Sequence, residues 1–412
     1  MINELIYLQN PWLQEPGYSP KELKWPQRTL FDSLYKDILD TKQVTGLVGL
    51  RRTGKSTLLK QILGLMLKNP ANKNRILYFS FDEFGVEEKT ETLESVIKFF
   101  LEEIVDEKLH KIEKPVYLFL DEIQLIPYWQ DIVKRYYDLN QKLKFIVSGS
   151  SSLYILKKSK ESLAGRIFEK RLGPLSFEEY KIISGRKSLE EFLRLGQFPE
   201  LLELNDLEKR KEYLKEAVIK KVIETDIPKI LKIRKQFDFE RLFWSILPNT
   251  GQIISPTKLG SDLSMKKGTL FNYLSILEEA LLVSKIVNLS GSFRSEKRLL
   301  RKYYPGSSNF LSLSPENLSL GFFAENYIAN LLKQQSGDLY LFNERGKEID
   351  FVIPERKLAI EVKYQDVIHK SDYQFLKKYC DEKGYRGVVI CKDKCLIKEA
   401  GIDFVPLGSF SL

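Results

Sequence analysis

Short apolar runs alternate with longer stretches of helical periodicity in the first half of the chain. β-Branched and aromatic residues fill the runs at 44–48, 75–80, 116–120 and 144–148, and a helical pattern follows each of them. A shorter run at 169–172 ends before a Gly-Pro pair. This alternation predicts a parallel sheet that is covered by helices.

The second half of the chain has a more mixed pattern. Residues 176–236 are helical and charged, and residues 237–287 predict a compact helical unit that ends in a short strand. A basic segment with Gly and Ser follows at 288–317. From residue 319 the pattern predicts a helix, two strands, another helix and another strand.

One loop between a predicted strand and a predicted helix carries a phosphate-binding motif. Residues 49–56 read Gly-Leu-Arg-Arg-Thr-Gly-Lys-Ser and fit the pattern G-x-x-x-x-G-K-[ST]. Glycines let backbone N–H groups turn toward phosphates, and the following helix N-terminus adds a favourable dipole. Lys55 is expected to bridge the β- and γ-phosphates, and Ser56 to bind Mg²⁺. The expected ATP-binding residues are Gly49, Leu50, Arg51, Arg52, Thr53, Gly54, Lys55, Ser56 and Thr57.

Two later strands end in residues that suit ATP hydrolysis. The apolar run at 116–120 leads into Asp121, which we expect to orient Mg²⁺, and Glu122, which we expect to polarise the attacking water. A strand that simply ends in two solvated acids is the alternative, but the pairing with the phosphate loop favours catalysis. The run at 144–148 ends in small hydroxyl residues, so Ser148 or Ser150 is a candidate sensor of the γ-phosphate, with an ordinary turn as the alternative.

Several motifs resemble a bacterial and archaeal family of AAA+-type ATPases. They are the runs at 121–124, 148–151, 163–166, 174–179 and 196–200. The resemblance covers about residues 25–405 and implies a P-loop module followed by a C-terminal domain of uncertain function. It makes Arg166 a candidate arginine finger, acting on ATP in a neighbouring subunit or closing in cis. A structural salt bridge is the alternative for this arginine.

Residues 255–287 resemble a winged helix-turn-helix. Ser255 and Pro256 open a short helix, and Ser264 is expected to cap a second helix whose leucines recur at helical spacing. The strand at 283–287 would form the wing. The expected DNA-contacting residues are Lys266, Lys267, Thr269 and Asn272, and Arg294, Lys297 and Arg298 in the adjoining basic run. A role in packing or oligomerisation alone is the alternative.

Four charged residues near the C-terminus form a nuclease-like pattern: Glu325, Asp350, Glu361 and Lys363. Side chains alternate between the faces of a strand, so the last three converge on the polar face of two neighbouring strands at 348–353 and 358–364. The set resembles the PD-(D/E)xK nuclease core, in which carboxylates hold Mg²⁺ and a lysine assists the attacking water. Isoleucine stands where that motif has proline, and a binding or assembly domain without cleavage is the alternative.

Composition narrows the class of protein. The 412 residues carry a net charge of +9, which favours a polyanionic partner such as DNA or a lysine-rich surface that serves solubility. Three cysteines and two histidines argue against a structural zinc site. No signal-peptide pattern and no membrane-spanning run is found, so a cytoplasmic location without membrane contact is expected.

We therefore expect an α/β chain with a P-loop (AAA+/ASCE-type) parallel sheet, a helical lid, a winged-helix domain and a C-terminal α/β restriction-endonuclease-like domain. The expected parts are the ATPase core at 1–180, the lid at 181–236, the winged helix-turn-helix at 237–290, a basic connector at 291–318 and the nuclease-like domain at 319–412. The expected function is Mg²⁺-dependent ATP hydrolysis coupled to DNA binding, remodelling or cleavage, in a homo-oligomer. The alternative is a nucleotide-gated switch whose nuclease-like domain cuts nothing and binds a protein partner.

Overall fold

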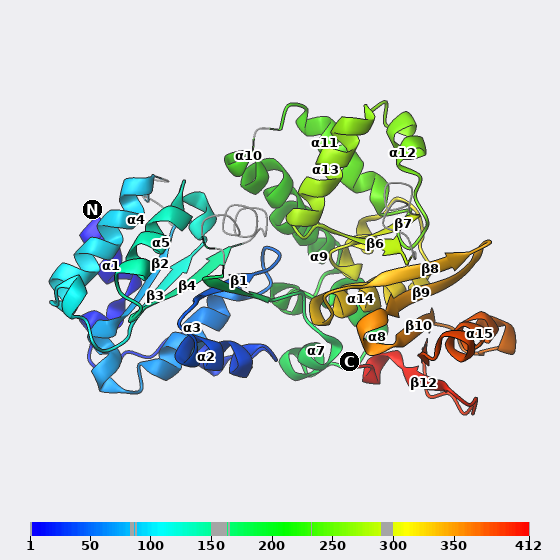
Figure 1. The fold of residues 1–412 in the computed structure, drawn as a ribbon, viewed down its shortest axis with the longest axis horizontal. Helices are drawn as coiled ribbons and strands as arrows, with labels where there is room; N and C mark the ends of the chain where they lie inside the picture. The colour runs from blue at the N-terminus through cyan, green and yellow to red at the C-terminus, as the bar shows by residue number, and fades with distance from the viewer. Residues whose placement is uncertain are drawn as a thin grey trace. The chain divides into compact units, whose positions relative to one another are not determined.

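The computed structural model describes residues 2–82, 86, 89–149, 163, 165–231, 233–289 and 300–411 (Figure 1). The chain forms two compact units. The first consists of Met1–Gly173 and Thr225–Lys232, and the second of Pro174–Glu224 and Ile233–Leu412. The short segment Thr225–Lys232 therefore belongs to the first unit, although residues of the second unit precede and follow it in the sequence.

The first unit is built on a parallel five-stranded sheet in the order β2-β3-β4-β1-β5. Its strands are β1 (Val44–Val48), β2 (Ile76–Ser80), β3 (Val116–Asp121), β4 (Leu143–Gly149) and β5 (Ile167–Arg171). The first four strands are almost wholly buried, as their continuous apolar sequences require for a sheet covered on both faces. The predicted parallel sheet is confirmed.

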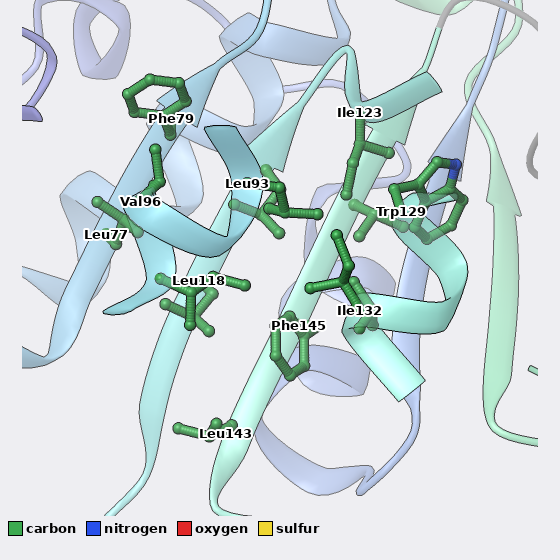
Figure 2. Close-up of a cluster of buried hydrophobic side chains, with 14 of the residues drawn as sticks. Leu77, Phe79, Leu93, Val96, Leu118, Ile123, Trp129, Ile132, Leu143 and Phe145 are labelled. Atoms are coloured by element: carbon green, nitrogen blue, oxygen red, sulfur yellow. The ribbon is translucent and has the colours of Figure 1, made fainter. Parts of the chain in front are cut away.

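Helices cover both faces of this sheet. On one face, α2 (Phe31–Asp40) and α3 (Lys55–Met66) share a buried apolar cluster with the strands. On the other face lie α1 (Ile2–Gln9), α4 (Thr90–Phe99) and α5 (Trp129–Leu139). In Figure 2, side chains of α4 and α5 meet those of β3 and β4 in this second cluster. Packing in these two clusters fixes the positions of the strands, and with them the positions of their carboxyl ends.

The second unit contains a mixed seven-stranded sheet in the order β12-β11-β10-β9-β8-β6-β7. Its strands are β6 (Val283–Asn288), β7 (Arg301–Pro305), β8 (Tyr340–Glu344), β9 (Lys347–Ile353), β10 (Leu358–Lys363), β11 (Arg386–Cys391) and β12 (Ile402–Pro406). β8, β9 and β10 pair antiparallel, while β10, β11 and β12 pair parallel. β6 pairs antiparallel with β7 and parallel with β8.

The helices of the second unit come before and between these strands. They are α7 (Phe177–Ser184), α8 (Leu189–Leu195), α9 (Leu207–Tyr213), α11 (Gln236–Ile246), α12 (Pro256–Asp262), α13 (Lys267–Glu279), α14 (Leu320–Gln335) and α15 (Gln374–Lys383). A π-helix (Leu214–Asp226) runs from the second unit into the returning segment of the first, which holds α10 (Ile227–Ile230).

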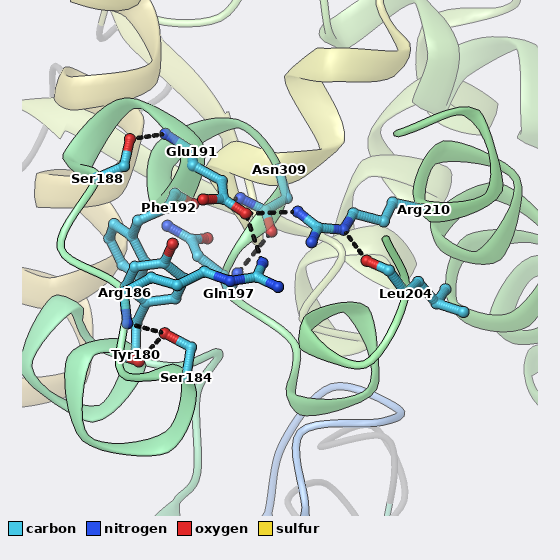
Figure 3. A network of polar contacts seen from close by, with 10 residues as sticks. All are labelled: Tyr180, Ser184, Arg186, Ser188, Glu191, Phe192, Gln197, Leu204, Arg210 and Asn309. Atoms are coloured by element: carbon cyan, nitrogen blue, oxygen red, sulfur yellow. Dashed lines mark hydrogen bonds and ion pairs between the residues drawn. The ribbon is translucent and has the colours of Figure 1, made fainter. Parts of the chain in front are cut away.

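A buried polar network joins α8 to a 3-10 helix (Ser308–Leu313) that follows β7 (Figure 3). The amide nitrogen of Asn309 donates to the carbonyl oxygens of Phe192 and Leu193, at 3.0 and 2.9 Å, and its side-chain oxygen accepts from the backbone of Gln197 at 2.7 Å. Such satisfied buried amides fix one packing arrangement because any other would leave them without partners.

Two expectations for this region are wrong. The described part of the expected connector at 291–318 contains β7 and the 3-10 helix, and the expected wing strand at 283–287 is β6 of the seven-stranded sheet. The strand β7 was not predicted because it is buried on both faces, so its sequence does not alternate between buried and exposed positions. Ser264 does not cap α13, because it has a left-handed backbone (φ 53°) and the helix begins after Lys266.

Candidate functional site

The phosphate-binding loop connects β1 to α3 in a conformation that its glycines permit. Gly54 has φ 93°, and α3 begins directly after it. Gly49 lies against the carbonyl oxygen of Leu172, which a Cβ atom at this position would approach to 2.2 Å. Only glycine therefore allows the chain to leave β1 here while Leu172 donates its backbone N–H to Val48 at 2.8 Å.

Lys55 stands at the first turn of α3 and is buried. Its ammonium group donates to the carbonyl oxygens of Gly49 and Leu50, at 3.2 and 3.0 Å, so the side chain folds back over the loop. Burial lowers the pKa of Lys55, and the nearby carboxylates of Glu122 and Asp121 oppose this change. In these surroundings the ammonium group can exchange its carbonyl partners for phosphate oxygens, which carry more negative charge.

Asp121 is held at the end of β3 by neighbours on both sides. Tyr78 of β2 donates its hydroxyl to one carboxylate oxygen at 2.8 Å, and Ser148 of β4 donates to the other. The backbone N–H of Glu122 also donates to Asp121, at 3.1 Å. Ser148 was expected to sense the γ-phosphate, and the described contact joins it to the acid instead. Tyr78 was missed, because nothing in its own apolar run marks its hydroxyl as functional.

Glu122 follows with a left-handed backbone (φ 53°), which turns it out of the line of β3. The side-chain amide of Gln124 donates to its carboxylate at 2.5 Å. Burial raises the pKa of Glu122; Lys55 opposes this effect, and Asp121 adds to it. A carboxylate with a raised pKa is a stronger base, as a residue that accepts a proton from water requires.

The residues present fit Mg²⁺ and a nucleoside triphosphate. Ser56 and Asp121 offer the hard oxygen ligands that Mg²⁺ prefers, and the N-terminus of α3 with Lys55 suits phosphate oxygens. Leu50 is buried, while Thr53 donates its hydroxyl to the carbonyl of Leu50 at 2.9 Å and shapes the loop. Bound ATP would supply an activated phosphoryl group, and Glu122 would accept the proton of the water that attacks it.

Arg166, an expected site residue, is not brought to this loop. Arg166 lies just before β5, beside the start of β1, whereas the phosphate loop follows the other end of β1. Its guanidinium forms an ion pair with Asp138 at 3.0 Å, which agrees with the alternative of a structural salt bridge. A role as an arginine finger stays a prediction. Ser150 lies outside the described residues.

The nuclease-like residues gather in the second unit. Asp350 of β9 and Glu361 of β10 are buried, and Asp350 accepts from the backbone N–H of Val362 at 2.9 Å. Lys363 forms an ion pair with Glu361 at 2.8 Å. One oxygen of Glu361 is buried without a hydrogen-bond partner. Burial raises the pKa of Glu361 well above its ordinary value, and Asp350 adds to this.

Lys302, which the sequence places in the basic run that we expected to contact phosphates, lies instead among the carboxylates of Glu325 and Asp350. The ammonium of Lys302, from β7, lies 3.0 Å from Glu325 and 3.6 Å from Asp350, and it also pairs with Glu348. The Lys302 side chain is only 3% exposed. Burial alone would lower its pKa, but Tyr304 and the three carboxylates raise it well above the usual value.

This arrangement does not fit Mg²⁺. Lys302 stands among the carboxylates that the metal would need, and Tyr304 donates its hydroxyl to Glu325 at 2.7 Å. Among the described residues, no group of three or more His, Cys, Asp or Glu side chains is arranged to hold a metal ion. The oxygen of Glu361 without a hydrogen-bond partner would favour a cation, but Lys363 already offsets the charge of this carboxylate.

The expected DNA-contacting residues lie at the start of α13. Lys266, Lys267 and Asn272 are exposed, and Thr269 is half-buried. The helix pair α12 and α13 is followed by the β6–β7 hairpin, as a winged helix requires, but β6 continues into the larger sheet. Arg294, Lys297 and Arg298 lie outside the described residues.

Comparison with known proteins agrees with the fold of the first unit. Residues 41–181 match the model of an AAA domain. The sheet, the phosphate loop and this match show that the first unit contains an AAA domain with a P-loop fold. Residues 186–305 and 320–410 match the models of two domains of unknown function, DUF8612 and DUF4143.

Related proteins occur in archaea and bacteria. The chain is similar to the uncharacterized protein MJ1637 of Methanocaldococcus jannaschii, with 25% identity over 90% of this chain and 85% of that protein. It is also similar to an uncharacterized protein of Haemophilus influenzae, with 24% identity over 80% and 83% of the two chains. The fold resembles the Walker-type ATPase PABY2304 of Pyrococcus abyssi, with a TM-score of 0.51, 15% identity and coverage of 73% of this chain and 99% of that one.

No membrane-spanning helix is found in the part of the chain that the structure describes.

Proposed function

We propose that this chain binds ATP with Mg²⁺, hydrolyses it, and couples the turnover to binding or remodelling DNA. The observation that carries the proposal is the buried ammonium of Lys55 on a phosphate-binding loop, under the electrostatic influence of Asp121 and Glu122. In this reading Glu122 accepts a proton from the attacking water. Asp121, held by Tyr78 and Ser148, orients the metal.

The ATPase proposal is tested by nucleotide binding and phosphate release. Lys55→Ala is expected to abolish saturable binding of a fluorescent ATP analogue in the presence of Mg²⁺, because the phosphates lose their buried cation. The matched control is Lys60→Ala, in the same helix, whose ammonium pairs with Glu22 at 3.7 Å. Equal binding by both variants would refute the proposed site.

The DNA proposal is supported by the exposed lysines at the start of α13 and by the net charge of +9. We expect duplex or branched DNA to raise the ATP turnover of the wild-type protein, and Lys266→Ala/Lys267→Ala to reduce that stimulation without changing the basal rate. Turnover that is indifferent to every DNA form would remove DNA from the proposal and leave the ATPase intact.

A second candidate is favoured by Lys302: a nucleotide-gated switch whose C-terminal domain cuts nothing and binds a partner. An internal ammonium among Glu325, Glu348 and Asp350 supplies the positive charge that Mg²⁺ would bring to a nuclease. This ammonium is buried and paired with three carboxylates, so it is not available to polarise a phosphodiester. The nuclease-like residues then serve as a structural joint between β7, β9 and α14.

Metal binding separates cleavage from this second candidate. In an Asp121→Asn background without nucleotide, we expect no Mn²⁺ binding by calorimetry, and a gain of binding when Lys302→Met frees the carboxylates. Mn²⁺ binding that needs no change at Lys302, together with DNA cleavage lost in Asp350→Ala, would establish a nuclease instead.

A further inference from the structure

One arginine of the phosphate loop is held by a carboxylate from a distant part of the chain. One guanidinium nitrogen of Arg51 lies 3.2 and 3.1 Å from the two oxygens of Asp226, and the other lies 3.2 Å from Asp82. The side chains of Arg51 and Asp226 are 16% and 10% exposed. Shielding from water makes this ion pair stronger than one at the surface.

Asp226 belongs to the segment Thr225–Lys232, which packs with the first unit although the chain on both sides of it lies in the second. Ile227, the next residue, is almost wholly buried. The short helix α10 that follows packs against the 3-10 helix Ile123–Leu125, directly after Glu122. The segment thus contacts both the phosphate loop and the end of the strand that carries the catalytic acids.

Arg51 and Lys55 share the carboxylates that surround this loop. Arg51 and Lys55 act on the carboxylates of Asp121, Glu122 and Asp226, and Arg51 also pairs with Asp82. A triphosphate brought to this loop would add negative charge next to Asp226, and like charges at close range repel.

Resting on the ATP binding proposed above, we propose that Asp226 and the phosphates of ATP compete for Arg51, so that nucleotide binding releases the segment Thr225–Lys232 from the phosphate loop. Arg51 then binds either Asp226 or the phosphates, and in this way transmits nucleotide occupancy to the chain that leads into the second unit. Linkage makes the effect reciprocal: whatever draws the segment away from the loop tightens nucleotide binding by the same factor.

The test combines nucleotide affinity with amide hydrogen exchange of residues 225–231 in the full chain. In the wild type, a non-hydrolysable ATP analogue with Mg²⁺ is expected to speed exchange in this segment. Asp226→Asn should exchange fast without nucleotide and bind the analogue roughly 5- to 150-fold more tightly, the usual range of such coupling. Asp82→Asn, which alters the other partner of Arg51, should leave exchange of the segment as in the wild type.

Arg51→Gln separates competition from simple damage to the fold. It should speed exchange of the segment as Asp226→Asn does, but weaken nucleotide binding, because the loop loses a cation. Opposite effects on affinity with the same effect on exchange are not expected of two merely destabilised proteins. If the analogue binds the wild type but exchange in the segment stays unchanged or slows, this inference is overturned and the proposed function is not. Absence of any analogue binding would instead refute the proposed function on which the inference rests.

Discussion

At the scale of single residues, Glu122 is the side chain whose surroundings speak most directly for hydrolysis. Glu122→Gln keeps its size and its contact with Gln124, so nucleotide affinity should stay within a few-fold of the wild type. Turnover should fall by a factor on the order of 10² to 10⁴, the usual contribution of a general base. Phosphate release and analogue binding measure the two effects, with the exposed Glu113→Gln as control. Loss of both together would assign Glu122 a structural role.

Glu325 should make stability depend on pH. Burial, with the help of Asp350, raises its pKa from 4.5 to about 7, although Lys302 and Tyr304 oppose the shift. Between these two values the folded chain keeps a proton that the unfolded chain releases, so the free energy of unfolding falls as pH rises. The full difference is about 3 kcal/mol.

Urea unfolding between pH 4.5 and 7.5 checks this expectation. Glu325→Gln, which cannot ionise, should show a flatter dependence than the wild type over that window, whereas the exposed Glu316→Gln should follow the wild type. A slope that the glutamine leaves unchanged would place the raised pKa on another group.

The sequence predicts the residues of the nucleotide site better than their partners. Lys55 and Asp121 stand in motifs whose spacing is set by phosphate and metal chemistry. Lys302 and Asp226 carry no such mark, because their roles come from strand pairing and chain return across long sequence distances. A lysine in a basic run is ordinarily a solvated side chain, and only burial of β7 makes this one an internal cation.

At the scale of elements, the edge between β1 and β5 depends on a glycine. A methyl group at Gly49 would meet the backbone oxygen of Leu172, whereas one at Gly46, in the same strand, would meet only the side-chain tip of Ile167 at 3.2 Å. Gly49→Ala should therefore lower the free energy of unfolding by about 2 kcal/mol, and Gly46→Ala by less. Urea unfolding of both variants tests this, and equal losses would contradict the close approach.

The start of α13 yields a prediction about salt. If Lys266 and Lys267 contact phosphates, replacing both with alanine should make the slope of log affinity against log salt shallower by about 2. Anisotropy titrations of labelled DNA at several salt concentrations measure it. The double variant Lys378→Ala/Lys383→Ala, in α15, controls for net charge. An equal change in both variants would indicate binding by overall charge.

Element types were predictable where one period dominates the sequence. β1 to β4 follow from buried apolar runs of strand length, and the helix after the phosphate loop follows from its motif. The 3-10 helix Ser308–Leu313 was missed, because its buried serines and asparagine look like loop residues. Their burial is stable only through partners in α8, which no local pattern reveals.

At the scale of the whole molecule, we expect the two compact units to unfold in two transitions. A ligand that binds only the folded first unit should stabilise that unit by RT ln(1 + [L]/Kd), about 2.7 kcal/mol at a hundredfold excess over Kd. Scanning calorimetry with Mg²⁺ and a non-hydrolysable ATP analogue should then raise one transition. In Lys55→Ala neither transition should move.

The unfolding transition of the second unit tests whether nucleotide binding is coupled to that unit. Because Thr225–Lys232 is tied to the phosphate loop through Arg51 and Asp226, its release on nucleotide binding would lower or broaden the transition of the unit that flanks it. In Asp226→Asn, where that tie is already broken, the analogue should raise the first transition and leave the second unchanged. A second transition that ignores nucleotide in both proteins would mean that the returning segment anchors the chain without carrying a signal.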